Sequence, residues 1–251
     1  MERIRKYGLP CLLALIIMAG SLKYMSHLVT VSNNVNGREL PIHSVAIDEP
    51  KVALTFDVAW SDDGIPQILE VLAQHNLRVT FFVTGDWVEK YPDIVKEIQA
   101  AGHDLGNHSA NHRSMTQMAK GEQEQQILET HKKVKEITGI EMNLFRPPYG
   151  DYNDELILTA EAAGYFVVKW DVDSLDWKDY GAESIISTVI NHETLQKGSI
   201  ILCHSGTKYT VEALEGMIEG LQGKGYEVVP VSALIYSEDY HMDIKGRQVK
   251  D

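Results

Sequence analysis

The sequence predicts an α/β fold, a distorted (β/α)7 barrel in which parallel strands alternate with helices. From residue 51 onward, apolar runs of strand length alternate strictly with amphipathic stretches of helix length. The strand runs are almost continuously apolar, which is typical of parallel strands buried on both faces. Seven strands within about 190 residues favour closure into a barrel. An open doubly wound sheet is the alternative.

The elements follow one another in a regular order. The expected strands are residues 52–57, 79–84, 103–107, 144–146, 165–171, 199–204 and 227–231. Helical patterns cover residues 65–75, 88–101, 124–138, 155–163, 182–191 and 211–224. Four of these helices are followed by a glycine at the usual stop position: Gly102, Gly139, Gly164 and Gly225. No glycine-rich phosphate-binding motif follows a strand, so nucleotide binding has no support.

Composition limits the classes of function. The chain has 251 residues, of which 44% are hydrophobic, enough for a sizeable core in one large domain. Its net charge of −13 argues against nucleic acid or an anionic membrane surface as a partner. Cys11 and Cys203 lie in different contexts and predict no disulfide framework. We expect a monomer whose fold depends on its core.

The N-terminus resembles an export signal. Three basic residues within the first six precede an apolar stretch, residues 9–19, which is short for a membrane span. Residues 19–21 form a tolerable small-residue cleavage site. We therefore expect residues 1–26 to be a signal peptide or an N-terminal membrane anchor. The remainder would be secreted or membrane-anchored outside the cytoplasm, at a bacterial cell envelope.

Three further segments are expected after this signal. Residues 27–50 are polar, with Asn36 and Gly37 near their centre, and are predicted to be a linker. Residues 51–236 hold the whole strand and helix pattern and form the predicted domain. Residues 237–251 remain as a C-terminal tail.

Unusual polar residues follow the predicted strands where a barrel gathers its active site. They are Asp57, His108, Arg146, the segment from Asp171 to Asp176, and His204. His108 and His112 are four residues apart, a spacing that lets two imidazoles share one metal ion. Arg146 ends an apolar run, so it needs a carboxylate partner if it points inward.

Taken in order, these segments resemble the NodB-homology polysaccharide deacetylases, carbohydrate esterase family 4, including bacterial sporulation-type members. Five motifs carry the resemblance: Thr55-Phe56-Asp57, His108-Ser109-Ala110-Asn111-His112, Arg146-Pro147-Pro148-Tyr149-Gly150, Asp173-Ser174-Leu175-Asp176-Trp177 and Leu202-Cys203-His204. They correspond to the family's T-F-D-D-G, H-[ST]-x-x-H, R-x-P-[YF]-G, D-x-x-D-W and L-x-H. Five matches in the right order are far more specific than any one of them.

The resemblance implies a divalent metal, by default zinc, bound by His108 and His112. Asp57 would be the general base that takes a proton from the attacking water. Arg146 would keep Asp57 ionised. Asp176 would in turn hold Arg146.

The same resemblance assigns the remaining roles. His204 would be the general acid that protonates the departing amine. The backbone N–H of Tyr149 would bind the developing oxyanion. Tyr149, Trp177 and Pro148 would contact the sugar.

One departure from the family motif affects the metal site. Val58 stands where the family has the second aspartate of T-F-D-D-G, and valine cannot bind a metal. We expect a carboxylate from the longer loop, Asp63 in preference to Asp62, to take the vacant position. Otherwise the site relies on two histidines and water, and both aspartates serve as helix-capping residues.

The expected function is therefore removal of N-acetyl groups from amino sugars of peptidoglycan or a chitin-like polysaccharide. Two alternatives remain: a carbohydrate-binding relative that has lost catalysis, which Val58 suggests, and a metal hydrolase of another amide. Retention of Asp57, Arg146 and His204 favours the enzyme, because a binding protein has no need of all three. Trp60 lies in the loop after Val58, where the sequence departs from the family motif. Its side chain could equally cover the bound sugar or pack in the core.

Overall fold

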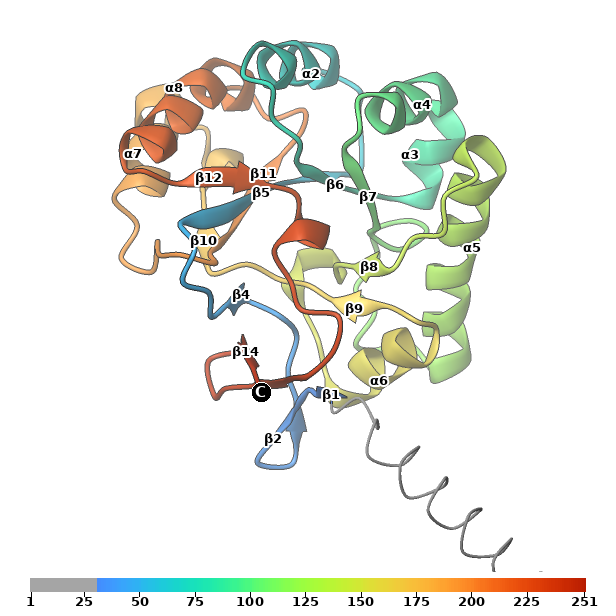
Figure 1. The fold of residues 1–251 in the computed structure, drawn as a ribbon. Helices are drawn as coiled ribbons and strands as arrows, with labels where there is room; N and C mark the ends of the chain where they lie inside the picture. The colour runs from blue at the N-terminus through green and yellow to red at the C-terminus, as the bar shows by residue number, and fades with distance from the viewer. Residues whose placement is uncertain (1–30) are drawn as a thin grey trace, which may run out of the picture.

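A computed structural model describes residues 31–251. Its centre is a parallel sheet with the strand order β10-β11-β5-β6-β7-β8-β9, and β12 also pairs with β5 (Figure 1). The strands are β5 (Lys51–Val58), β6 (Thr80–Val83), β7 (Asp104–Asn107), β8 (Leu144–Phe145), β9 (Phe166–Val167), β10 (Val172–Asp173), β11 (Ile200–His204) and β12 (Glu227–Val229). The predicted α/β architecture with a curled parallel sheet is confirmed.

One predicted strand is much shorter in the structure. Of the expected strand 165–171 only residues 166–167 form a strand, β9, and the next strand, β10, begins at residue 172 at the opposite end of the strand order. Only residues 168–171 separate them along the chain, and five peptide steps span at most about 18 Å. The sheet must therefore curl until its two ends lie close together, which gives an incompletely hydrogen-bonded barrel.

Helices surround the outer face of this sheet (Figure 1). They are α2 (Ile65–Gln74), α3 (Gly85–Lys90), α4 (Pro92–Ala100), α5 (Lys120–Thr138), α6 (Asp154–Ala162), α7 (Ala182–Ile190) and α8 (Thr210–Gly223). Short 3-10 turns are η1 (Pro148–Gly150), η2 (Asp176–Lys178) and η3 (Val231–Ala233). The predicted helix 88–101 is two helices, because Pro92 lacks the N–H that a continuous helix needs and begins α4 instead.

The alternation of side chains along β5 decides which residues reach the barrel interior. Every second residue packs in the core between sheet and helices: Val52, Leu54, Phe56 and Val58. Successive side chains of a strand point to opposite faces, so Asp57 faces the other way, into the barrel. The strand thus directs the carboxylate inward and directs Val58 toward the helices.

A second, smaller sheet joins the two ends of the described chain. Its order is β1 (Val31–Ser32), β13 (Tyr240–Met242), β14 (Arg247–Lys250) and β4 (Ser44–Val45). The linker predicted for residues 27–50 and the tail predicted for residues 237–251 are therefore wrong where the structure describes them. Asn36 and Gly37, with φ of 54° and 83°, form the turn of a hairpin between β2 (Asn34–Val35) and β3 (Arg38–Glu39).

This smaller sheet packs against the amino ends of the barrel strands. Val45, Tyr240 and Met242 share an apolar cluster with Ala53 and Ile200. The backbone N–H of Val45 donates to the carbonyl of Gly198, 2.9 Å away, just before β11 begins. The two sheets therefore share one core.

Within residues 31–251, no helix is both long and apolar enough to cross a bilayer. The signal peptide or anchor predicted for residues 1–26 lies outside the described residues.

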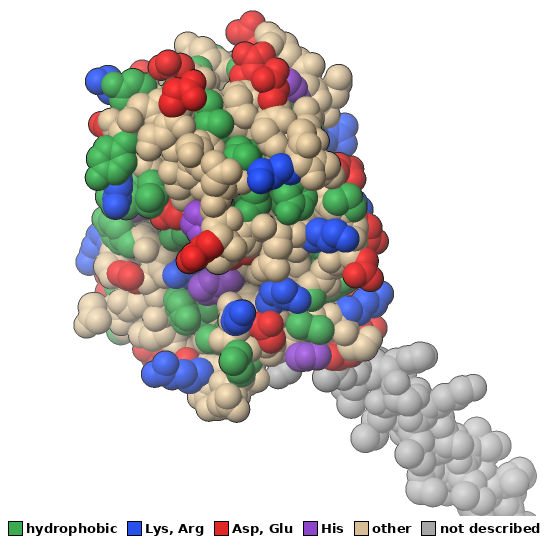
Figure 2. Space-filling view, turned by 90° about the vertical axis from the view of Figure 1, so that its left-hand side faces the viewer, with side chains coloured by type: hydrophobic (Ala, Val, Ile, Leu, Met, Phe, Trp, Pro, Cys, Tyr) green, Lys and Arg blue, Asp and Glu red, His purple; other side chains and the backbone are tan. Residues whose placement is uncertain are grey.

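In Figure 2, acidic side chains gather at the top of the face shown, and basic and acidic side chains are interspersed below them.

Replacement of Gly198 by alanine is expected to destabilise the fold by about 3 kcal/mol. The φ of Gly198 is +82°, and a Cβ there would lie 1.8 Å from the carbonyl oxygen of Val45. Urea denaturation measures the change. The matched control is Gly121→Ala in α5, where a Cβ meets nothing within 4 Å, and we expect it to stabilise by roughly 0.4–1 kcal/mol. Equal effects of the two substitutions would contradict the close contact between Gly198 and Val45, where the two sheets meet.

Candidate active site

The proposed base and acid lie on neighbouring strands at the carboxyl edge of the sheet. His204 at the end of β11 is the register partner of Asp57 on β5, and adjacent strands are about 4.8 Å apart. Both residues line a cavity of about 420 Å³. Other residues of its wall include Trp60, His112, Tyr149, Trp170 and Trp177. The parallel register of β5 and β11 therefore places Asp57 and His204 side by side in the wall of this cavity.

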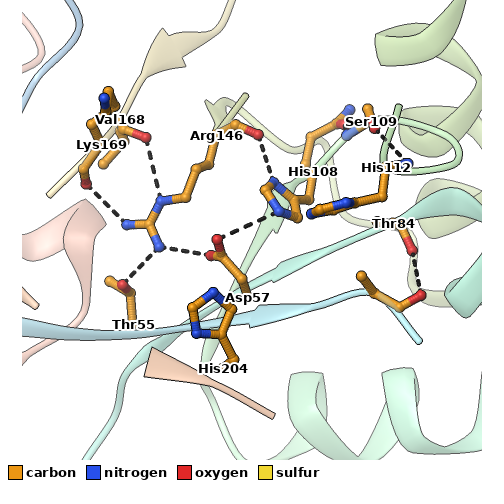
Figure 3. Close-up of polar contacts among 12 residues, drawn as sticks. Thr55, Asp57, Thr84, His108, Ser109, His112, Arg146, Val168, Lys169 and His204 are labelled. Atoms are coloured by element: carbon orange, nitrogen blue, oxygen red, sulfur yellow. Dashed lines mark hydrogen bonds and ion pairs between the residues drawn. The ribbon is translucent and has the colours of Figure 1, made fainter. Parts of the chain in front are cut away.

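Arg146 is fully buried, and every one of its guanidinium nitrogens has an acceptor (Figure 3). Nη1 donates to Asp57 Oδ1 at 2.7 Å and to Thr55 Oγ1 at 2.9 Å. Nε and Nη2 donate to the carbonyls of Val168 and Lys169, at 3.4 and 3.0 Å. The guanidinium carbon also lies 4.1 Å from the centre of the Phe82 ring. Arg146 therefore joins β5 to the segment that crosses from β9 to β10.

The charges around Asp57 keep it ionised. Burial alone would raise the pKa of this carboxyl, but the positive charge of Arg146, with further contributions from His108 and His204, holds its pKa below the ordinary value. An ionised carboxylate can accept a proton, as a general base must.

His108 has a defined tautomer. Its Nδ1 lies 2.7 Å from the carbonyl oxygen of Arg146, which can only accept, so Nδ1 carries the hydrogen. Burial lowers the pKa of His108, so the ring is neutral and Nε2 presents a lone pair. That atom is buried, has no hydrogen-bond partner and lies 3.4 Å from Asp57 Oδ2. Two acceptor atoms that face each other call for a positively charged group between or beside them.

His112 lies beside His108 because the chain makes a tight turn after β7. Ser109 and His112 both have positive φ, 69° and 57°, and the His112 N–H donates to Ser109 Oγ at 3.1 Å. The two imidazole ring centres are 4.8 Å apart. Burial is the main reason that the pKa of His112 is lowered to about 4, and repulsion between two protonated imidazoles acts in the same direction. Such strained backbone is characteristic of functional sites.

These two histidines fit the chemistry of a metal site. Each has a buried ring nitrogen without a hydrogen-bond partner, Nε2 of His108 and Nδ1 of His112. Each has a lowered pKa, and a neutral imidazole is the form that binds a metal. The Arg146 carbonyl fixes the orientation of the His108 ring, as expected of a residue that supports a metal ligand. Zinc commonly accepts such nitrogen ligands.

The structure does not bring Asp63 to the two histidines, which corrects the prediction of a loop carboxylate as third ligand. Asp63 is exposed and Asp62 is half-buried. Within residues 31–251, no group of three or more His, Cys, Asp or Glu side chains is arranged to hold a metal ion. Both acids lie in the loop between β5 and α2, and neither is part of the wall of the cavity that contains His112.

Asp176 contacts His204, and the predicted contact between Asp176 and Arg146 is wrong. Asp176 is fully buried, and its Oδ1 lies 2.8 Å from His204 Nδ1. Its Oδ2 accepts from the His204 N–H and from Thr210 Oγ1, both at 2.7 Å. Burial alone would lower the pKa of His204, but the hydrogen bond and negative charge of Asp176 raise it above the ordinary value. This shift favours the protonated form of His204, the form that a general acid needs.

The loop after Arg146 places one of the two residues predicted to contact the sugar in the cavity wall. Tyr149 is 63% exposed, lines the cavity and has a φ of 61°. Its ring centre lies 4.6 Å from that of His112. Pro148, in contrast, is buried in η1 and is not part of the cavity wall, so its predicted contact with substrate is wrong. Trp177 is 54% exposed and lines the cavity beside Asp176.

Sequence reasoning missed three side chains that complete the site. Thr55 precedes Asp57 by two residues, so the strand period alone places it on the same face. Thr210 binds Asp176 from the start of α8, and no motif marks it. Ser205 lines the cavity, and its buried Oγ has no hydrogen-bond partner.

Comparison with known proteins identifies the family. The family model described as polysaccharide deacetylase matches residues 45–168. A peptidoglycan-N-acetylglucosamine deacetylase of Bacillus cereus is 37% identical over 193 residues, which cover 75% of this chain and 89% of the relative. The chain belongs to the polysaccharide deacetylase family. It spans between 38% and 89% of the length of eight curated relatives.

Two solved structures of this family have the same fold. One is a peptidoglycan N-acetylglucosamine deacetylase, with a TM-score of 0.74 and 33% identity, covering 77% of this chain and 92% of the other. The second is a family 4 pseudoenzyme from Bacillus anthracis, with a TM-score of 0.74 and 29% identity, covering 84% and 73%. This polysaccharide deacetylase therefore resembles both an active and an inactive protein, and its own site residues must distinguish the two.

We expect Arg146→Met to destabilise the protein by about 3–5 kcal/mol, because it leaves the buried Asp57 carboxylate without its charge partner. Chemical denaturation measures the loss. The matched control is Arg113→Met, which removes an exposed ion pair with Glu122 and is expected to cost less than about 1 kcal/mol. A similar small cost for both would mean that the Arg146 ion pair is not a structural requirement.

Proposed function

We propose that this polysaccharide deacetylase hydrolyses N-acetyl groups of peptidoglycan or a chitin-like glycan outside the cytoplasm, with a divalent metal, zinc by default. The observation that carries the proposal is the pair Asp57 and His204 at one register position. Each has its own charged partner, and the two partners set opposite protonation states. The sequence-based export signal and the names of the relatives support the location and the substrate class.

The reaction divides between the two side chains. Asp57 accepts a proton from a water molecule as the water oxygen bonds to the acetamide carbon. The carbon–nitrogen bond then breaks, and the nitrogen takes a proton from His204 as it leaves as the amine. Acetate is the second product. Arg146 stabilises the Asp57 carboxylate before the reaction, and Asp176 stabilises the protonated His204 imidazole.

His108 and His112 would hold the metal through the ring nitrogens that have no other partner. A metal bound there supplies a Lewis acid that polarises the acetamide carbonyl. The chain's own contribution is to keep both rings neutral by burial, to orient the His108 ring through the Arg146 carbonyl, and to hold the backbone of His112 through the Ser109 hydroxyl. The Tyr149 N–H is proposed as the additional donor to the oxyanion.

A catalytically inactive, carbohydrate-binding protein is the second candidate. It is favoured by Val58, which leaves two histidines without the family's carboxylate, and by the likeness to a pseudoenzyme. Against it stands the completeness of the acid and base pairs. A binding protein gains nothing from a buried carboxylate that raises the pKa of His204.

Acetate release from N-acetylglucosamine tetramers and from peptidoglycan, measured together with bound zinc, tests the proposal. We expect the purified protein to bind zinc and to release acetate. His108→Ala is expected to weaken zinc binding by at least about a hundredfold, since residues that only hold a metal ligand in place already contribute about 10–100-fold. Activity should fall in parallel.

The matched control is Asp63→Ala, which removes an exposed carboxylate from the neighbouring loop. It should bind zinc as tightly as the parent protein. Binding of glycan without acetate release would establish the inactive binding protein instead. Release of acetate only from a non-sugar amide would identify a hydrolase of another substrate.

The pH dependence of kcat/KM tests the role of Asp176. Activity should require ionised Asp57, whose pKa is lowered, and protonated His204, whose pKa is raised. The rate should therefore be high between these two values and fall as the pH rises through that of His204. Asp176→Asn removes the negative charge that raises the pKa of His204, so the alkaline limb should move to lower pH. An unchanged alkaline limb would exclude His204 as the acid.

A further inference from the structure

Trp60 lies in the loop where this chain departs from the family motif, between β5 and α2. The indole N–H of Trp87 donates to the carbonyl of Ser61 at 3.0 Å. The Ser61 hydroxyl in turn accepts from the backbone N–H of Asp63 at 3.3 Å. Ser61, the neighbour of Trp60, is thus held through both its carbonyl and its side chain. These contacts fix the position of the loop without using the Trp60 side chain.

The Trp60 side chain projects from this fixed loop into the opening of the active site. It lines the 420 Å³ cavity and is 65% exposed. Its ring centre lies 4.8 Å from that of His112, at an interplanar angle of 61°. An indole with most of its surface in water provides a flat apolar face for a ligand. The alternative role as a core residue is excluded by this exposure.

Exposed aromatic rings lie on both sides of the reacting groups. Trp60 adjoins His112, on the side of the proposed metal. Trp177 follows Asp176, whose carboxylate contacts His204, and its side chain lines the same cavity. If the sugar that places its acetamido group in this cavity belongs to a glycan chain, the neighbouring sugars of that chain come close to these aromatic side chains.

We propose that Trp60 stacks on the sugar ring next to the one that loses its acetyl group, so that the site selects oligomeric over single sugars. This inference rests on the proposed deacetylase function. The apolar face of a pyranose ring matches the indole face, and the contact adds binding energy that a monosaccharide cannot use. Trp60 is therefore a specificity-determining residue for chain length.

The test compares Trp60→Ala with the parent protein on N-acetylglucosamine and on its tetramer, by acetate release. We expect KM for the tetramer to rise about tenfold, with kcat within about twofold and the rate on the single sugar unchanged. Trp60→Phe should restore most of the affinity, because it keeps a flat ring. Zinc content and melting temperature should match the parent, since the side chain is exposed.

Tyr180→Ala is the matched control, because Tyr180 is 70% exposed but is not part of the cavity wall. It should leave KM for the tetramer unchanged. An active parent whose tetramer KM is the same in Trp60→Ala would overturn the inference and leave the deacetylase function intact. Loss of zinc from Trp60→Ala would also overturn it, because the residue would then support His112. A parent that releases no acetate from any glycan would refute the deacetylase function itself.

Discussion

The ion pair between Arg146 and Asp57 is the interaction on which the rest of the site depends. A guanidinium with no exposure must have all its donors satisfied, and its acceptors come from two parts of the chain, β5 and residues 168–169. The same contact that keeps Asp57 ionised therefore also holds the crossing segment against the barrel interior. The stability of the fold and the ionisation of Asp57 both depend on Arg146, so a substitution of Arg146 changes both.

Parallel strands explain how two groups with opposite protonation can work beside each other. Asp57 and His204 are register partners, and each contacts a charged partner of its own, Arg146 for the proposed base and Asp176 for the proposed acid. Two adjacent titratable groups without such partners would share one proton between them. Here the partners are buried, and solvent screens their effect little. The different protonation states of Asp57 and His204 are therefore favoured by the protein itself, before substrate binds.

The alternation of strands and helices, and the polar residues at strand ends, could be predicted from sequence because both follow from local period and order. Pairing between distant side chains could not. The sequence predicts a contact between Asp176 and Arg146, but Asp176 binds His204 instead. The order of residues along the chain does not reveal which of these two basic side chains the carboxylate contacts. The hairpin turn at Asn36 and Gly37 did carry a local signal, which composition obscured. The position of Asp63 depended on the path of an unusual loop, for which no periodicity exists.

The smaller sheet has a consequence for how a polymer meets the enzyme. Its apolar side chains, among them Val45 and Tyr240, fill the amino end of the barrel together with Ala53 and Ile200. The smaller sheet covers this end, and the cavity that contains Asp57 and His204 lies at the opposite, carboxyl ends of the strands. With the proposed function, a glycan strand would lie across this cavity and present its acetamido groups to Asp57 and His204 one at a time.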